Sequence, residues 1–151
     1  MRKKSYEYVG KRLPRMDADL QLTGACRYGD DYYLPGMLIA KPKYSDISHG
    51  KILNIDVSEA ESMPGVAAII THKDIPCNRY GNATPPDQYV LSSDRVLYHG
   101  DCIAVVAAET RQQAEDAAKR IHVTYEELPA IKSIEEALAP DAPPARSDYP
   151  D

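Results

Sequence analysis

The feature that most constrains the fold is a continuous apolar run followed at once by a capped helix, at residues 103–121. Residues 103–108 read IAVVAA, and a strand that is apolar on both faces is typical of the middle of a sheet. Thr110 is expected to cap the next helix, and Gln113 completes a capping box. One face of that helix carries small apolar side chains at helical spacing: Ala114, Ala117, Ala118 and Ile121. The sequence therefore predicts a central strand with a helix packed closely on it.

Two further strands are predicted in the first half of the chain. A Leu-Pro-Gly turn at residues 34–36 precedes an apolar run at residues 37–44. Because Pro42 cannot donate to a strand ladder, this strand is expected to lie at a sheet edge or to end there. Residues 51–57 alternate, and one face of that strand is expected to carry Leu53, Ile55 and Val57.

The remaining predicted elements are short. The apolar run at residues 66–71 predicts a buried strand, and the alternating run at residues 121–125 predicts another. Capping-box spacings predict two short helices and a turn, which begin at Ser58 with Glu61, Ser133 with Glu136, and Thr71 with Asp74. Residues 76–94 are rich in Pro, Gly, Asn and Ser, so a long functional or interfacial loop is expected there.

These elements predict an α+β fold in which a mixed sheet packs with short capped helices. The strand order stays open. Residues 1–30 are expected to form an extended arm without a packed element. Residues 1–8 are expected to be a tail, residues 9–138 the domain, and residues 139–151 a proline-rich linker. A linker that runs to the last residue suggests that the chain once continued or that a partner chain takes over.

The acidic composition excludes some classes of partner. A formal net charge of −5 argues against a nucleic-acid surface, which needs a basic face. No apolar run approaches the ~20 residues of a membrane-spanning helix. Three cysteines, Cys26, Cys77 and Cys102, cannot all pair within one chain, so a reducing cytoplasm is the expected compartment.

The strongest candidate for a metal site is the run His-Gly-Asp-Cys at residues 99–102, just before the central strand. Structural zinc sites use two close pairs of ligands, whereas His99 and Cys102 form only one such pair. The favoured interpretation is a loop histidine followed by a buried free thiol, with Gly100 and Asp101 forming the turn between them.

A cysteine nucleophile is the second candidate. Cys102 could pair with His99 or His122, but a nucleophile needs an exposed, electropositive setting, and Cys102 leads into an apolar strand. Cys77 in the long loop is better placed, yet the sequence defines no base for it. No glycine-rich phosphate loop is present, and adjacent carboxylates such as Glu126 and Glu127 are expected to face solvent. The residues alone therefore predict a domain without a self-contained active site.

Several segments, taken in order, resemble one known module. They are TGACRYGDD at 23–31, LPGML at 34–38, MPGV at 63–66, YHGD at 98–101 and YEELPA at 125–130. Their order and spacing are similar to the α/β hammerhead domain, the N-terminal domain of the molybdenum-binding large subunit in the xanthine dehydrogenase and aldehyde oxidase family. The resemblance runs over most of the chain, from about residue 9 to residue 138.

The resemblance implies part of an oxidoreductase that hydroxylates a heterocycle or an aldehyde with oxygen from water. The complete enzyme would use a molybdenum–pterin cofactor, iron–sulfur clusters and often FAD, all held outside this domain. The chain is therefore expected to bind no cofactor or metal, to hold no catalytic residue and to be inactive alone. Its expected partners are the molybdenum-binding domains or subunit, the iron–sulfur subunit and, in some enzymes, a flavin subunit.

The same resemblance implies that two polar loops contact neighbouring domains. The candidate interdomain interface consists of Asn78, Arg79, Tyr80, Gly81, Tyr98, His99, Gly100 and Asp101. One departure concerns a Ser-Pro and His-Ala-Arg-Ile pattern of many relatives, where this chain has Asp46 for the proline and Gly50-Lys51 for the Ala-Arg pair. A bidentate arginine contact at Lys51 is therefore not expected to transfer.

Two alternatives stay open. The first is a free-standing protein-interaction module that reuses the fold, which the absence of any neighbouring molybdenum subunit would favour. The second is a small thiol or metal enzyme, which metal content or thiol reactivity of the purified chain would reveal.

Overall fold

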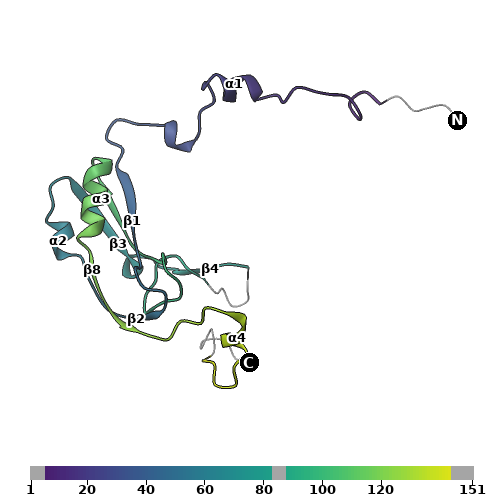
Figure 1. The fold of residues 1–151 in the computed structure, drawn as a ribbon. Helices are drawn as coiled ribbons and strands as arrows, with labels where there is room; N and C mark the ends of the chain where they lie inside the picture. Colours follow the sequence, from purple (N-terminus) through teal and green to yellow (C-terminus); the bar gives the residue numbers. More distant parts are fainter. Residues whose placement is uncertain (1–5, 83–87, 144–151) are drawn as a thin grey trace. The chain divides into compact units, whose positions relative to one another are not determined.

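The computed structural model describes residues 6–82 and 88–143, drawn in Figure 1. The chain divides into two compact units, Met1–Met37 and Leu38–Asp151. Parts of the predicted tail at 1–8, the predicted loop at 76–94 and the predicted linker at 139–151 lie outside the described residues.

The first unit holds little regular structure. It contains helix α1 (Ala18–Leu22) and the 3-10 helix η1 (Gly29–Asp31), and none of its described residues is buried. The expectation of an arm without packed side chains is confirmed, but the expectation that it is extended throughout is wrong. Local polar contacts form the helical turns: the Gln21 amide donates to the Asp17 carboxylate at 2.7 Å, and the N–H of Tyr28 donates to the Asp31 carboxylate at 2.8 Å.

The predicted Leu-Pro-Gly turn is confirmed at the end of this unit. The N–H of Met37 donates to the carbonyl oxygen of Leu34 at 3.0 Å, and Gly36 has a φ of +76°. The third position of a type II turn requires a positive φ, which glycine adopts without strain.

The second unit contains a three-stranded antiparallel sheet with the order β1-β7-β3, formed by β1 (Ile39–Tyr44), β7 (Cys102–Ala108) and β3 (Val66–Thr71). The central place of β7 confirms the prediction from its apolar run. The edge position of β1 is also confirmed. Pro42 is tolerated there because an edge strand needs ladder donors on one side only.

The prediction that residues 66–71 form a buried strand is wrong. β3 pairs only with β7 among the described strands, and Ile70 is 41% exposed. One face of β3 does pack inward, because Val66 and Ile69 lie against the hydrophobic core. A short apolar run does not distinguish an edge strand from a central one, since both present one side to the core.

A second antiparallel sheet has the order β6-β2-β8, formed by β6 (Arg95–Val96), β2 (Gly50–Asp56) and β8 (His122–Glu127). The strand expected at 121–125 is confirmed as β8. The regular alternation expected in β2 is wrong, because its register with β8 shifts between Ile52 and Asn54. Leu53 is the extra residue of this bulge and is 60% exposed, whereas Ile55 and Val57 of the predicted face do lie against the hydrophobic core. Ile52 is also half-buried.

The segment expected to be a long loop at 76–94 contains regular structure. Strand β4 (Arg79–Tyr80) pairs antiparallel with β5 (Gln88–Tyr89) in a sheet of two strands. The prediction of a loop without strands is therefore wrong. Composition rich in turn residues predicts irregular chain but does not exclude short strands within the segment.

Helix α3 (Arg111–Lys119) lies on the β1-β7-β3 sheet, as Figure 1 shows. The Thr110 hydroxyl accepts the N–H of Gln113 at 3.3 Å, which confirms the predicted cap. The predicted face is buried, and the core cluster consists of Ala60, Ala104, Val106, Ala117, Ala118 and Ile121. Because most of these side chains are alanine, the helix and the sheet can approach closely.

The predicted cap of helix α2 (Ser58–Glu61) is wrong. Ser58 is the first helical residue, and its side chain accepts no helical N–H. The carboxylate of Asp56 instead accepts the N–H of Ser58 at 3.0 Å and its hydroxyl at 2.6 Å. A carboxylate is the stronger acceptor, so the last residue of β2 takes the role expected of the serine.

The other two predicted caps are confirmed. The Ser133 hydroxyl accepts the N–H of Glu136 at 3.1 Å and begins helix α4 (Ile134–Ala137). The Asp74 carboxylate accepts the N–H of Thr71 at 2.8 Å around the 3-10 helix η2 (His72–Asp74).

These elements confirm the predicted α+β class with short capped helices. The described strands all pair antiparallel, in two sheets of three strands and one of two. Within the described ranges, no helix has the length and apolar character needed to cross a membrane.

Candidate functional site

The turn at residues 98–101 is held against the segment that follows β1. The N–H of Asp101 donates to the carbonyl oxygen of Tyr98 at 3.2 Å, and Gly100 has a φ of +92°. The N–H of Gly100 donates to the carbonyl oxygen of Ser45 at 3.0 Å, and the N–H of Ser45 donates to that of Asp101 at 2.8 Å. This reciprocal pair confirms the prediction that Gly100 and Asp101 form the turn that leads into the central strand.

Asp101 and Tyr98 have different roles within this turn. The Asp101 side chain is buried, and its carboxylate accepts the N–H of Leu97 at 3.1 Å. The charge of Asp101, followed by burial, raises the pKa of the Tyr98 hydroxyl above its ordinary value. Tyr98 is 60% exposed, so it presents a protonated hydroxyl at the surface at neutral pH. Tyr98 is therefore suited to hydrogen bonding with a neighbour, whereas Asp101 stabilises the loop.

Cys102 is poorly suited to nucleophilic chemistry. It is half-buried at the start of β7, and its Sγ lies 3.9 Å from the carbonyl oxygen of Ala104. Burial, followed by the charge of Asp101, raises the pKa of the Cys102 thiol. The thiolate is the reactive species, so this environment opposes catalysis and metal binding by Cys102. Cys26 and Cys77 are also free thiols, and Cys77 is exposed.

The side chain of Asn78 makes two hydrogen bonds across the second candidate loop. Its Oδ1 accepts the N–H of Leu91 at 3.0 Å, and its Nδ2 donates to the carbonyl oxygen of Leu91 at 2.7 Å. The main-chain oxygen of Asn78 also accepts the N–H of Val90 at 3.0 Å. The amide therefore mimics the backbone of a paired strand and holds the β4-β5 segment in place.

Arg79 and Tyr80 point to different surroundings. The Arg79 guanidinium donates to the Tyr89 hydroxyl at 2.6 Å and lies 4.5 Å from the centre of that ring. Tyr80 is 53% exposed, and its charge when ionised contributes to the raised pKa of Tyr98. Each of the two loops singled out in the sequence therefore presents an exposed tyrosine, Tyr80 or Tyr98, and Gly81 is also exposed.

A groove of about 320 Å³ opens beside the 98–101 turn, and we call it the His49 groove. It is lined by residues 48–49, 97–99, 129–132 and 143. His99 is exposed and lies in this lining. The sequence did not connect His49 with residues 129–132, because the two segments lie about 80 residues apart.

His49 contributes an unpaired hydrogen-bond acceptor. Its Nδ1 lies 2.7 Å from the carbonyl oxygen of Pro129. A carbonyl oxygen only accepts, so Nδ1 carries the hydrogen and Nε2 of the neutral ring has a free lone pair. That Nε2 is buried and has no hydrogen-bond partner among the described residues.

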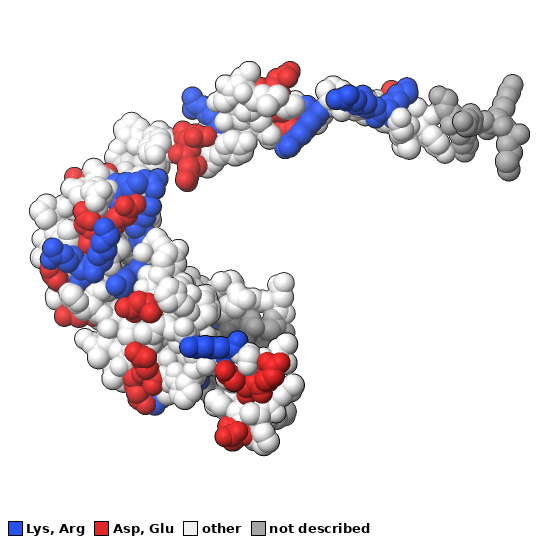
Figure 2. Space-filling model, in the orientation of Figure 1, with Lys and Arg blue, Asp and Glu red and all other residues white. Residues whose placement is uncertain are grey.

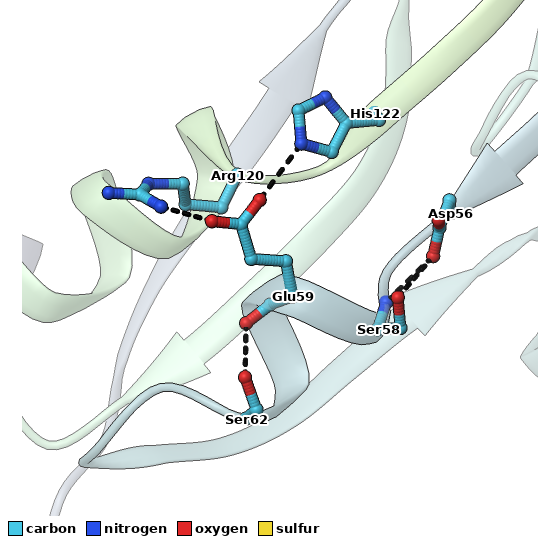
Figure 3. A network of polar contacts seen from close by, with 6 residues as sticks. All are labelled: Asp56, Ser58, Glu59, Ser62, Arg120 and His122. Carbon is cyan, nitrogen blue, oxygen red and sulfur yellow. Dashed lines mark hydrogen bonds and ion pairs between the residues drawn. The ribbon is translucent and has the colours of Figure 1, made fainter.

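Another histidine, His122, belongs to a separate surface cluster. His122 and Arg120 both contact the carboxylate of Glu59, with Nε2 of His122 at 2.9 Å (Figure 3). The hydrogen bonds from His122 and then from Arg120 lower the pKa of Glu59. The cluster joins α2, the end of α3 and the start of β8, so its role is structural. The described part of the chain contains no group of three or more His, Cys, Asp or Glu side chains placed to hold a metal ion.

The fold and the site together define a class of protein. It is an α+β domain whose buried polar groups hold loops in place and whose surface carries the exposed Tyr80 and Tyr98 and the His49 groove. The family described as aldehyde oxidase and xanthine dehydrogenase, a/b hammerhead domain, matches residues 23–129. The chain belongs to this family.

The relatives are much longer proteins. The xanthine dehydrogenase molybdenum-binding subunit of Escherichia coli is 40% identical over 140 residues, which cover 86% of this chain and 19% of that protein. The nicotinate dehydrogenase large molybdopterin subunit of Eubacterium barkeri is 36% identical, over 96% of this chain and 34% of that protein. The aldehyde oxidoreductase from Desulfovibrio gigas superimposes with a TM-score of 0.84 at 36% identity, over 91% of this chain and 16% of that chain. The chain thus spans about a third or less of these proteins.

The lining of the His49 groove does not fit a molybdenum–pterin group. Its imidazole, hydroxyl and ammonium groups come from three separate segments, 48–49, 98–99 and 132. One imidazole nitrogen is already bonded to Pro129. No step through that cofactor is assigned to this chain.

Proposed function

We propose that this chain is the hammerhead domain of a molybdenum-dependent hydroxylase of the xanthine dehydrogenase and aldehyde oxidase type. The complete enzyme would hydroxylate a heterocycle or an aldehyde with oxygen from water. Residues 9–138 would form the domain, and residues 139–151 the linker to the molybdenum-binding part. The observation that carries the proposal is the family match over residues 23–129, together with the superposition on aldehyde oxidoreductase at a TM-score of 0.84.

The role of the domain in this proposal is structural, and the chain is inactive alone. The candidate polar residues support this role, since Asp101 and Asn78 are bonded to backbone groups of their own loops. The raised pKa of the Cys102 thiol opposes a catalytic role for that residue. Tyr80 and Tyr98 are exposed and would contact neighbouring domains of the enzyme. The molybdenum–pterin, the iron–sulfur clusters and any FAD would be held by those domains.

The test is to tag the chain in its own organism and to measure molybdenum in the purified protein. We expect the purified assembly to carry molybdenum and to oxidise xanthine, nicotinate or an aldehyde with an artificial electron acceptor. The isolated 151-residue chain should carry no molybdenum and show no turnover. Stoichiometric molybdenum or turnover in the isolated chain, or none in the tagged assembly, would contradict the proposal.

Hydrogen exchange tests the interface residues separately. Residues 78–81 and 98–101 should gain protection in the assembled enzyme relative to the isolated chain. Equal exchange in the two states would remove these loops from the interface and leave the family assignment untouched.

The alternative is a free-standing protein-interaction module. The open edge of β3 and its exposed Ile70 favour it, because unpaired edges can accept a strand from another chain. Purification of the tagged chain with a stable partner but without molybdenum would select this alternative.

A further inference from the structure

The His49 groove has an apolar rim that the described chain leaves uncovered. Leu97 is 38% exposed and Ile131 is 36% exposed, and both line the groove. An occupant that covers these two side chains would remove their apolar surface from water.

The apolar surface continues from the groove onto α4. Lys132 and Pro143 both line the groove, so the α4 segment begins and ends beside it. Ile134 is 74% exposed and Leu138 is 79% exposed on this segment. Exposed apolar side chains that adjoin a groove are typical of a surface for another polypeptide, and they extend beyond the reach of a small ligand.

The charge of this surface restricts the occupant further. Residues 129–143 contain one basic side chain, Lys132, and three acidic ones, Glu135, Glu136 and Asp141. Figure 2 shows acidic side chains gathered around α4. The Glu136 carboxylate accepts the N–H of Lys132 at 2.7 Å, while Glu135 is exposed and makes no hydrogen bond or ion pair within the described residues. Charge complementarity therefore favours an occupant with a basic side chain beside its apolar residues.

We propose that the His49 groove and α4 together dock an extended apolar segment, flanked by a lysine or arginine, from the molybdenum-binding part of the enzyme. The inference rests on the proposed function. The apolar side chains of the segment cover Leu97 and Ile131, and its cation faces Glu135. The long relatives supply the source, because this chain spans about a third or less of their length.

The first experiment uses two variants of the tagged chain. Ile131→Asp places a charge on the apolar rim, and Glu135→Lys reverses the charge of α4. Each should lower the molybdenum recovered per chain by about tenfold, the effect of losing ~1.4 kcal/mol at an interface. The matched controls, Leu53→Asp in the β2 bulge and Glu109→Lys after β7, lie outside this surface and should stay within about twofold of the unchanged chain. Circular dichroism should show that all four variants fold.

The second experiment identifies the occupant with a photoreactive benzoylphenylalanine at position 131. The crosslinked peptide should come from the molybdenum-binding part and carry a lysine or arginine beside apolar residues. A crosslink to an acidic segment or to a second copy of this chain would overturn the inference, as would normal molybdenum recovery with Ile131→Asp and Glu135→Lys. Loss of molybdenum from the unchanged chain would instead refute the proposed function, so the two failures can be told apart.

Discussion

Replacement of Gly100 by alanine tests how far backbone conformation alone stabilises the 98–101 turn. Gly100 has a φ of +92°, and a Cβ added there would meet no atom within 4 Å. The substitution therefore introduces no clash, and its cost comes from placing a side chain in the left-handed region. That cost is about 1–2 kcal/mol, offset in part by the ~0.4–1 kcal/mol that alanine contributes by restricting the unfolded chain.

The net loss of unfolding free energy should be about 1 kcal/mol if the turn keeps its geometry. If the backbone relaxes instead, the conformational penalty is exchanged for a weaker hydrogen bond from Gly100 to Ser45, and this exchange occurs only where it lowers the total cost. The expected loss for Gly100→Ala is therefore about 1 kcal/mol, with a fall in Tm of roughly 4 °C in a domain of this size.

Urea unfolding, followed by far-ultraviolet circular dichroism, measures this loss. Tyrosine emission gives a second probe, because the chain has 11 tyrosines and no tryptophan. Gly29→Ala is the matched control: Gly29 has no positive φ and nothing lies within 4 Å of an added Cβ, so it should stay within about 0.5 kcal/mol of the unchanged chain. Equal stability of Gly100→Ala and Gly29→Ala would refute the reasoning.

Three further predictions concern the core, a cap and alkaline pH. Ile103→Ala should cost about 2–5 kcal/mol in urea unfolding because Ile103 is fully buried in β7, whereas Ile70→Ala, at a position 41% exposed, should cost about 1 kcal/mol or less; similar costs would contradict the burial assigned to the two strands. Thr110→Ala should cost about 1 kcal/mol and speed amide exchange at Gln113, since the hydroxyl caps α3; unchanged exchange there would count against the cap. Burial raises the pKa of Tyr125 to about 12, so its neutral hydroxyl stabilises the fold fully below about pH 10 and progressively less as the pH rises towards 12. Tyr125→Phe should flatten this alkaline loss of stability, and an unchanged pH profile would exclude Tyr125 as its cause.

The elements that were predicted correctly from the sequence are those determined by residues close together in the chain. The central strand β7 and the buried face of α3 follow from an apolar run and from alanines at helical spacing. The edge position of β1 follows from Pro42, whose missing N–H has the same consequence in any fold. The Thr110 and Ser133 caps likewise depend on atoms three residues apart.

Features that depend on distant partners were predicted wrongly or missed. The bulge at Leu53 arises from the register of β2 with β8, which lies about 70 residues away. The sequence pattern within β2 does not predict it. The edge position of β3 depends on which strand lies beside it. His49 gains its significance from the carbonyl oxygen of Pro129, which only the folded chain brings within 2.7 Å.

Gln113 and Asp56 show a further limit on the prediction of helix caps from sequence spacing. Capping-box spacing identified the correct region of α3, but the Thr110 hydroxyl donates to the Gln113 side chain at 2.8 Å, in place of the expected bond from the backbone N–H of Thr110. At α2, Asp56 lies close enough to outcompete the serine expected to cap. Sequence spacing therefore locates a cap, whereas the choice between neighbouring acceptors depends on the path of the backbone.

The interleaved order of the strands determines when the second unit can form during synthesis. β1 and β3 both pair with β7, and β2 pairs with β8. Ile39 therefore cannot pair until Ala108 has been synthesised, and Asp56 cannot pair until His122 has been synthesised. The β1-β7 and β2-β8 pairings close loops of roughly 60–75 residues, and the β3-β7 pairing closes one of roughly 35–40, which slows folding compared with a chain of local hairpins. Three early strands therefore leave the ribosome without their partners, and their open edges can pair with the wrong chain until Glu127 has emerged. The nascent chain is consequently at greatest risk of aggregation while the first half of each sheet is complete and the second half is still being made.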